Sequence, residues 1–444
     1  MRRLLVLCYF FPPHGGGGVH RVLGFTRHLP DHGWDCSVVC AGESDYWITD
    51  ERLRARVSPR TEVVRVPGGS PLWAWLKLRR RDRGRRPERA FGLLRRLSDF
   101  WLIPDPYVTW AGRCRAAGAR LLRRGGFDAM LSTSPPDSVH LAASSLRERF
   151  ALPLVADFRD PWMGLYHRPP PTAWHAARQA ALERRVLRTA DLVTTATRAH
   201  ARDLEARSEA RPRRVAHIPN GFEPHGADAA PEAGVADAAP EPGDGKFLIV
   251  FTGTLAKMPE ANVFLEALHE LLARRPEARR RLRAKLAGPY ETGYADRAVA
   301  LGLTPGIVEF LGSLAYDAAR ELQRRADLLV LWKMERMDAT VPGKLYEYLD
   351  SGRPVLAALG DGDEAAALLE RAGGACVPPG ARAALAEAIE RRYLEWRHSG
   401  RAPSRRPEWL EALTRARLAA QLAAELDRVC ADGAAERPMP GAGA

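Results

Sequence analysis

The chain begins Met1-Arg2-Arg3-Leu4-Leu5-Val6-Leu7-Cys8-Tyr9-Phe10, and this stretch guides the interpretation of the whole fold. Its apolar run is shorter than the roughly 18 residues of a membrane-spanning helix, and no small-residue cleavage site of a signal peptide follows it. We therefore predict a buried first strand at Leu4–Tyr9. A glycine run and a helical pattern at Val19–Leu29 come next. A continuous apolar strand followed by a helix is typical of a parallel sheet covered on both faces.

The alternation of strands and helices continues through the first half of the chain. Further strands are predicted at Cys36–Cys40, Glu62–Val66, Ala129–Ser132, Leu154–Asp157 and Leu192–Thr195. Helical patterns between them include Ser138–Arg149 and Ala173–Thr189. Residues 226–245 are rich in Ala, Pro, Gly and acidic residues without apolar periodicity, which predicts a linker or a mobile loop.

A second alternating series begins at Phe247–Phe251. Its later strands are predicted at Lys285–Ala287, Ile307–Phe310, Leu328–Leu331, Val355–Ala358 and Ala375–Val377, and its helices at Ala261–Ala273, Asp317–Arg325 and Gly343–Ser351. A last helical stretch covers Glu408–Val429. We expect two doubly wound α/β domains with a cleft between them. Because open sheets of this kind bind ligands at the carboxyl ends of their strands, the sequence predicts a nucleotide-like ligand.

The 444 residues have the composition of a globular protein, with 46% hydrophobic and 27% charged residues. Six scattered cysteines without a Cys-x-x-Cys pair favour reduced thiols in the cytoplasm over a zinc site. Lys and Arg number 67 against 54 Asp and Glu, which gives a net charge of +13. This excess favours a polyanionic partner, and nucleic acid, anionic lipid and a nucleotide diphosphate all qualify. The predominance of arginine also fits a GC-rich genome, which weakens the inference.

A glycine run lies between the first predicted strand and the first predicted helix, at residues 15–18. Glycines let the backbone approach an anion closely, and the following helix offers free N–H groups, so Gly16 and Gly17 are candidates for binding a phosphate. A flexible turn is the alternative. The spacing matches neither Gly-x-Gly-x-x-Gly nor a Gly-Lys-Ser/Thr motif, which disfavours a Rossmann dehydrogenase and a P-loop nucleotidase.

The stretch Thr340-Val341-Pro342-Gly343-Lys344-Leu345-Tyr346-Glu347 predicts a helix start with two functional side chains. Lys344 and Glu347 are three residues apart and share one helix face. The helix start and Lys344 suit a phosphate, and Glu347 suits ribose hydroxyls. The alternative is a surface ion pair between the two side chains.

An ordered set of segments resembles the family 4 glycosyltransferases of the GT-B fold. The segments are Tyr9–Pro13 with the glycine run and Arg21, Ser132–Leu141, Ala156–Trp162, Ile218–Phe222, Phe251–Leu255, Val308–Leu314 and Pro342–Tyr348. The last is similar to the donor-binding helix of bacterial members that build surface polysaccharides. Each segment is weak evidence, but the ordered set is specific.

The resemblance implies an α/β protein of two Rossmann-like domains facing across a cleft, with a C-terminal helix that returns to the first domain. We expect the acceptor domain at 1–222, including an insert at about 71–110, a linker at 223–245, the donor domain at 246–405, the helix at 406–432 and a disordered tail at 433–444.

The resemblance also implies a retaining transfer of the hexosyltransferase type from a nucleotide-diphosphate sugar, with no metal or other cofactor. Helix dipoles and cations then stabilise the departing diphosphate. The implied donor-binding residues are Gly16, Gly17, Lys257, Gly312, Gly343, Lys344, Leu345 and Glu347. Two positions depart from the family pattern. Ala339 replaces the first of a usual pair of glutamates, and Thr254 stands where many members carry arginine, with Lys257 as its possible substitute. The donor sugar therefore stays open.

Asp157, Arg159, Asp160 and His140 are the candidate catalytic residues, because they follow two predicted strands of the first domain. Two acids and an arginine there suit an acceptor hydroxyl or the donor sugar. A buried Asp–Arg structural pair and a core histidine are the alternatives. Asp361-Gly362-Asp363 matches a metal-binding Asp-x-Asp only superficially, and we interpret it as a turn and helix cap.

The insert combines aromatic and basic residues. Trp73 and Trp75 precede a run of arginines at 79–89, and more aromatic and aliphatic residues follow up to Ile103. Aromatic side chains beside arginines suit the headgroup layer of an anionic bilayer. A loop that packs its aromatics on its own domain is the alternative. Nucleic-acid binding is not expected, since no known nucleic-acid module frames the run.

The sequence thus predicts a cytoplasmic glycosyltransferase, peripheral on the inner face of the cell membrane, that acts on a lipid-linked or glycan acceptor. Three alternatives stay open: a soluble glycosyltransferase acting on a small natural product, a sugar-nucleotide epimerase, and a non-catalytic nucleotide-binding scaffold.

Overall fold

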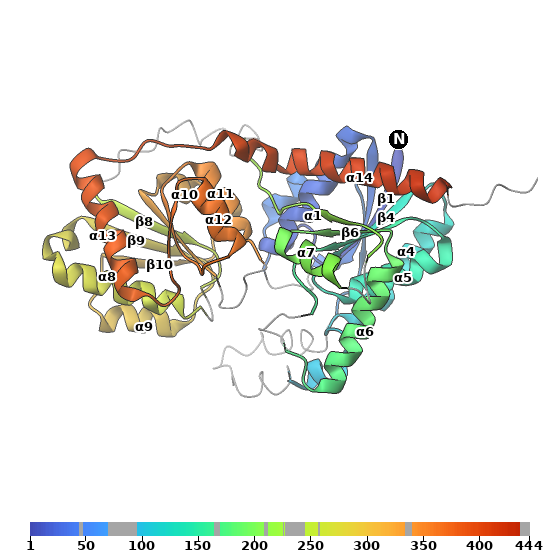
Figure 1. The fold of residues 1–444 in the computed structure, drawn as a ribbon, viewed down its shortest axis with the longest axis horizontal. Coiled ribbons are helices and arrows are strands. Elements are labelled where there is room, and N and C mark those ends of the chain that lie inside the picture. The colour runs from blue at the N-terminus through green and yellow to red at the C-terminus, as the bar shows by residue number, and fades with distance from the viewer. Residues whose placement is uncertain are drawn as a thin grey trace, which may run out of the picture. The chain divides into compact units, whose positions relative to one another are not determined.

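The computed structural model describes residues 1–43, 48–69, 96–163, 169–207, 212–224, 226, 245–255, 258–333 and 340–435. The chain forms two compact units (Figure 1). The first comprises Met1–Asn220 and Arg415–Ala444, and the second comprises Gly221–Thr414. Within the described ranges, no helix is both long enough and apolar enough to cross a membrane.

The described residues of the first unit form a seven-stranded parallel sheet in the order β3-β2-β1-β4-β5-β6-β7. Its strands are β1 (Arg2–Cys8), β2 (Trp34–Ala41), β3 (Glu62–Val66), β4 (Ala129–Ser134), β5 (Leu154–Phe158), β6 (Leu192–Thr195) and β7 (Val215–His217). The predicted strands of this unit are confirmed, whereas β7 was not predicted. It has three half-buried residues, too few to show an apolar run.

Helices cover both faces of this sheet: α1 (Gly17–His28), α4 (Val108–Arg123), α5 (Ser138–Phe150), α6 (Ala173–Thr189), α7 (Arg198–Ala206) and α14 (Arg415–Ala435). Two short 3-10 turns, η1 (Leu29–His32) and η3 (Glu51–Arg56), precede and follow β2 in the chain. Successive β1 side chains point to opposite faces. Leu4 and Val6 therefore pack in the core beneath α1 and α14, and Leu5 and Leu7 in the core beneath α4 and α5.

The C-terminal helix corrects one predicted boundary. Glu408–Leu413 is a separate 3-10 turn, η6, in the second unit, and Thr414 is extended (φ −66°, ψ 145°), so α14 begins only at Arg415. A Cβ on Gly24 of α1 would lie 2.4 Å from Cδ of Arg415, so glycine lets the two helices approach. Leucines of α14, such as Leu422, are buried in the core of the first unit. The expected return of this helix to the first unit is confirmed.

The described residues of the second unit form a six-stranded parallel sheet in the order β10-β9-β8-β11-β12-β13. The strands are β8 (Phe247–Thr252), β9 (Leu282–Ala287), β10 (Val308–Gly312), β11 (Leu328–Trp332), β12 (Val355–Ala358) and β13 (Ala375–Val377). The helices are α8 (Glu260–Arg274), α9 (Thr292–Ala300), α10 (Tyr316–Arg325), α11 (Gly343–Ser351), α12 (Glu364–Arg371) and α13 (Arg382–Ser399), with a 3-10 turn η5 (Pro276–Arg280). The α/β fold of two parallel-sheet domains is thus confirmed.

Candidate functional site

The second unit presents the ammonium group of Lys344 at the start of α11. Pro342 is the N-cap of this helix, and no side chain caps its free N–H groups. The Nζ atom of Lys344 lies 3.9 Å from the ring centroid of Phe251 on β8. That ring stacks in turn on Trp332 of β11, at 4.2 Å and an interplanar angle of 8°. No described residue accepts a hydrogen bond or forms an ion pair with this ammonium.

The surroundings of Lys344 favour the neutral amine over the charged ammonium. Burial lowers the pKa of Lys344 to about 7, although the carboxylate of Glu347 opposes the shift. The two side chains form no ion pair, so the alternative of a surface pair is wrong. An added anion would favour the protonated lysine and raise its pKa again.

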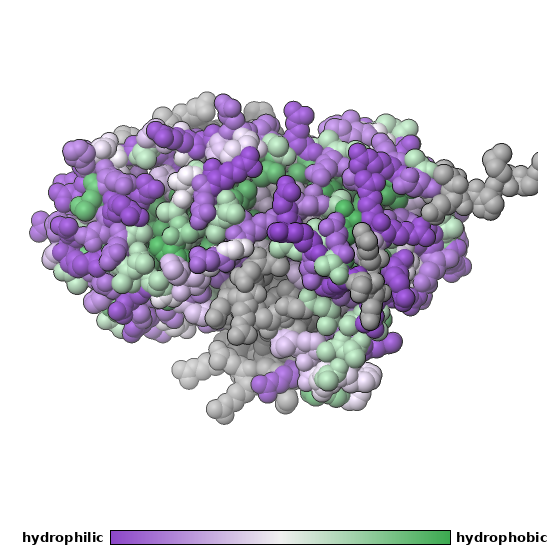
Figure 2. Space-filling model, viewed as in Figure 1, coloured by the Kyte–Doolittle hydropathy of each residue, from purple (hydrophilic) through white to green (hydrophobic). Residues whose placement is uncertain are grey.

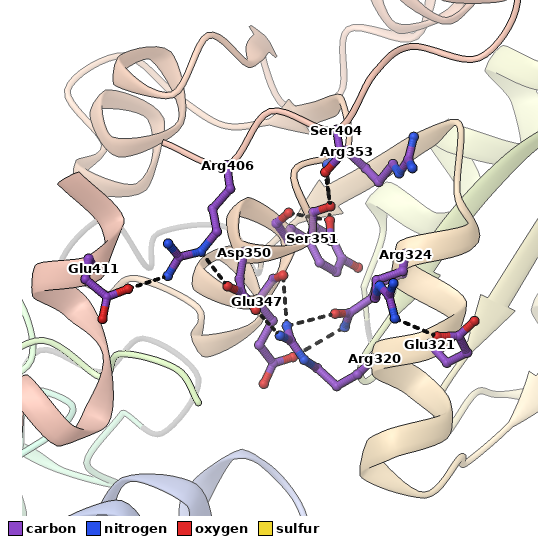
Figure 3. A network of polar contacts seen from close by, with 12 residues as sticks. Arg320, Glu321, Arg324, Glu347, Asp350, Ser351, Arg353, Ser404, Arg406 and Glu411 are labelled. Carbon is purple, nitrogen blue, oxygen red and sulfur yellow. Dashed lines mark hydrogen bonds and ion pairs between the residues drawn. The ribbon is translucent and has the colours of Figure 1, made fainter. Parts of the chain in front are cut away.

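Glu347, one turn along α11, is held by a network of buried polar side chains (Figure 3). The amide Nε2 of Gln323 donates to Oε2 of Glu347 at 3.3 Å and to Oγ1 of Thr252 at 2.9 Å. Arg320 donates to the backbone oxygen of Glu347 at 2.9 Å and forms a buried ion pair with Asp350. No described residue donates to the other oxygen, Oε1. The network thus orients the carboxylate and leaves one oxygen for a ligand.

Three glycines shape the carboxyl edge of this sheet. The N–H of Gly253, after β8, donates to the oxygen of Ala287 at 2.8 Å, and the N–H of Gly288, after β9, donates to the oxygen of Gly312 at 2.6 Å. A Cβ on Gly288 would lie 1.8 Å from the oxygen of Gly253, and a Cβ on Gly253 would lie 2.9 Å from Nζ of Lys344. Glycine thus lets the loops pack closely, and the missing Cβ at Gly253 leaves room for the side chain of Lys344.

The other predicted donor-binding residues fall in different places. Gly312 and Gly343 lie at this edge, with no heavy atom within 4 Å of a Cβ built on either. The prediction that the side chain of Leu345 contacts the donor is corrected, because this side chain is fully buried in the core beneath α11. Lys257 and Ala339 lie outside the described residues.

The segment before α11 is anchored by a second lysine. Lys333 donates to the oxygen of Thr340 at 2.9 Å and pairs with the buried Asp363. Asp363 also caps α12 by accepting from the N–H of Ala365 at 2.8 Å, which confirms the predicted helix cap. Among the residues that the structure describes, no group of three or more His, Cys, Asp or Glu side chains could hold a metal ion.

In the first unit, Asp157 is the centre of a buried network. Its carboxylate accepts from the guanidinium of Arg21 at 2.7 and 3.0 Å, from Thr133 at 2.7 Å and from Thr194 at 2.6 Å. Burial raises the pKa of Asp157, but Arg21 and the hydroxyls outweigh this and hold it below its usual range. The network supports the alternative interpretation of a structural pair over a catalytic acid.

Arg159 and His140 are also buried, and their hydrogen-bond partners belong to the first unit. Arg159 donates to the oxygen of Ser134 at 2.5 Å and to the oxygen of Gly18, so its guanidinium ties the glycine run to β4. His140 accepts or donates at Nδ1 with Ser132, 2.8 Å away, and stacks on Phe158. Burial lowers the pKa of His140 to about 3, which keeps the ring neutral.

Asp160, Gly16 and Gly17 are more accessible. Asp160 is half-buried beyond β5, and the two glycines are exposed where α1 begins. Gly16 has a positive φ of 83° and is the N-cap of α1. The sequence motifs identified Lys344 and Glu347, whereas Gln323 and Arg320 carried no recognisable signal because α10 reaches Glu347 only in the folded unit.

Comparison with known families agrees with this architecture. Residues 246–394 match the family described as Glycosyl transferases group 1, and residues 16–221 match the Glycosyl transferase 4-like domain. The two units therefore belong to glycosyltransferase domain families, and the chain is a glycosyltransferase of this two-domain type. Comparison with curated protein sequences gave no match.

Solved structures show the same fold at low sequence identity. The N-terminal domain of Candida albicans trehalose-6-phosphate phosphatase is 16% identical, with a TM-score of 0.64 over 96% of this chain and 97% of that one. Anabaena HepE in complex with UDP and glucose is 17% identical, with a TM-score of 0.54 over 98% and 99%. WaaG, a glycosyltransferase involved in lipopolysaccharide biosynthesis, is 16% identical, with a TM-score of 0.57 over 96% and 98%. The fold is that of the GT-B glycosyltransferases.

Proposed function

We propose that the second unit binds a nucleoside-diphosphate sugar at the start of α11, and that the protein transfers this sugar with retention to a lipid-linked or polysaccharide acceptor. The observation that carries the donor site is the ammonium of Lys344, which has an aromatic ring beneath it and no described hydrogen-bond acceptor. A diphosphate suits this place because the helix N-terminus and the ammonium both favour negative charge.

Glu347 supplies the second contact in this proposal. Its Oε1 accepts hydrogen bonds from the ribose hydroxyls, while Gln323 holds Oε2. Hydrogen bonds to a charged group contribute about 1.5–3 kcal/mol each. Anabaena HepE has been solved with UDP-glucose, so UDP is the first nucleotide to test here.

The proposed reaction is a transfer on one face of the donor sugar. The acceptor oxygen forms a bond to the anomeric carbon as the bond from that carbon to the β-phosphate oxygen breaks. The acceptor proton passes to the departing diphosphate, whose charge Lys344 and the start of α11 stabilise. Asp157 is not the nucleophile of a double displacement in this proposal, because its carboxylate is enclosed by Arg21, Thr133 and Thr194.

In this proposal, groups of the protein neutralise the charge of the diphosphate, and no metal ion is required. Transfer is therefore expected to continue in EDTA. Complete loss of transfer that added Mg²⁺ or Mn²⁺ restores would contradict a metal-independent mechanism.

The lipid-linked acceptor is supported by exposed apolar side chains of the first unit. Leu97, Phe100, Trp101 and Trp174 are 47%, 43%, 75% and 64% exposed, and we call them the aromatic patch. His175 joins its two segments, because its Nε2 lies 2.9 Å from the oxygen of Phe100. Figure 2 shows pale and green residues at this lower end of α6. Exposed tryptophans of this kind suit a membrane interface. Residues 70–95 of the predicted insert lie outside the described residues.

A panel of nucleotide sugars tests the proposed function. Thermal shift identifies the donor, since a ligand at 100 times its dissociation constant adds about 2.7 kcal/mol of stability. Release of nucleoside diphosphate is then measured with and without a lipid-linked acceptor. Acceptor-dependent release supports transfer. Conversion of the donor without any acceptor would indicate an epimerase, and binding without turnover would indicate a scaffold.

A further inference from the structure

A cavity of about 270 Å³ lies in the second unit at the far end of α11 from Lys344. Leu349 and Gly352 at the end of α11, Val355 at the start of β12 and Leu369 of α12 form its apolar walls. The exposed segment 402–407 lines another side through Ala402, Pro403, Arg405 and Pro407. Their position is fixed, because Ser404 donates to the oxygen of Ser351 at 3.0 Å (Figure 3).

Two glycines let the walls of this cavity pack closely. A Cβ on Gly374 would lie 2.1 Å from Cδ1 of Leu369, and a Cβ on Gly352 would lie 2.2 Å from Oγ of Ser404. Gly352 ends α11 with a φ of 66°, where glycine is favoured. The chain therefore turns tightly on two sides of the cavity.

Three arginines, Arg353, Arg392 and Arg405, line the same cavity. Arg353 donates to the oxygen of Ala402 at 2.9 Å, but its Nε is buried without a hydrogen-bond partner. The side chain of Arg405 has no hydrogen bond or ion pair to any described residue. Burial, followed by the positive charge of Arg401, lowers the pKa of Arg353. Among the described residues, only one of these three arginines pairs with a carboxylate: Arg392 lies 2.9 Å from Glu395.

We propose that this cavity is a second ligand site that binds a small organic phosphate. The phosphate lies between Arg353 and Arg405, because guanidinium groups match phosphate oxygens with paired hydrogen bonds. The less polar part of the ligand packs against Leu349, Val355 and Leu369. A cavity of about 270 Å³ is near the lower end of ligand pockets, so it suits a sugar phosphate better than a nucleotide sugar. This site is separate from Lys344 and Glu347 and does not depend on the proposed donor site.

Calorimetric titration of the full chain with glucose 6-phosphate tests the proposal, with glucose as the uncharged control. We expect the phosphate to bind and glucose not to. Arg405→Gln is expected to weaken binding about tenfold or more and to fold normally, because this exposed side chain forms no hydrogen bond or ion pair with a described residue. Arg353→Gln is expected to do the same. Lys344→Gln, which changes the proposed donor site, is the matched control and is expected to leave glucose 6-phosphate binding unchanged.

Three results would overturn this assignment. They are no binding by the wild type, equal binding by wild type and Arg405→Gln, and loss of binding in Lys344→Gln. The last would show that the probe occupies the proposed donor site instead.

Discussion

The ammonium of Lys344 lies 3.9 Å above the centre of the Phe251 ring, and no described oxygen accepts a hydrogen bond from it. A cation over an aromatic face gains part of its stabilisation from the ring. Its three N–H donors still require acceptors, which makes the lysine a site for an anion.

Nucleoside diphosphate affinity is expected to fall as the pH rises above 7. Burial lowers the pKa of Lys344 to about 7, so in the free protein the lysine loses its charge above that pH. Binding of UDP then requires uptake of a proton, and affinity falls by up to about tenfold per pH unit between pH 7.5 and 9. Titrations in buffers of different ionisation enthalpy measure this uptake. Lys344→Arg keeps its charge and is expected to bind without pH dependence, and an equal pH dependence in this variant would exclude Lys344 as the cause.

Replacing Glu347 is expected to weaken UDP binding while the fold stays intact. Glu347→Ala removes the proposed ribose contact, at a cost of about 1.5–3 kcal/mol. Gln323→Leu keeps the carboxylate but removes the donor that holds Oε2, so a smaller loss is expected. Calorimetry with both variants, and with Glu321→Ala on the exposed side of α10 as control, measures these effects. Unchanged affinity in Glu347→Ala would remove this residue from the site.

Gly253→Ala is expected to cost more free energy of UDP binding than free energy of unfolding. The new Cβ lies 2.9 Å from Nζ of Lys344 and displaces the ammonium. Part of the effect is backbone strain, since Gly253 has a φ of 133°. Gly302→Ala is the control for a positive φ without a neighbour, because φ there is 64° and no heavy atom lies within 4 Å. If both variants bind UDP as the wild type does, Gly253 does not position Lys344.

The aromatic patch is expected to bind anionic vesicles. Trp101→Ser with Trp174→Ser removes the two most exposed members and is expected to abolish co-sedimentation without changing UDP binding. Tyr290→Ser, an exposed aromatic of the second unit, is the matched control. The arginines at 79–89 of the insert should add attraction to anionic lipid, so attachment should weaken as salt shortens the Debye length from about 10 Å at 0.1 M to about 3 Å at 1 M. Wild-type protein that ignores anionic vesicles at low salt would favour a soluble acceptor.

The sequence predicted most strands of both sheets within a few residues. Strands buried on both faces are continuous apolar runs, as in β1 and β11, and such runs are visible without any neighbour. The start of β9 was missed because Arg283 and Lys285 alternate with buried residues. The site was predicted only where it is local. Lys344 and Glu347 share one helix, whereas Gln323 is 24 residues away from Glu347 in the chain.

Asp157 is a second residue whose partner is distant in the sequence. Its position after a strand left both a catalytic acid and a buried Asp–Arg pair open, and Arg21, 136 residues away in the sequence, encloses it only in the folded unit. Sequence spacing cannot reveal such a partner, and the partner decides whether a carboxylate is available for chemistry.

The discontinuity of the first unit reverses the usual order of folding during synthesis. Domains near the N-terminus generally fold first as the ribosome proceeds. Here Leu418, Leu422 and Leu426 of α14 complete the core of the first unit, so this core stays open until the whole second unit has been translated. At 5–20 residues per second that interval is roughly 10–40 s. The second unit, with its own continuous segment Gly221–Thr414, is therefore complete before the first one closes.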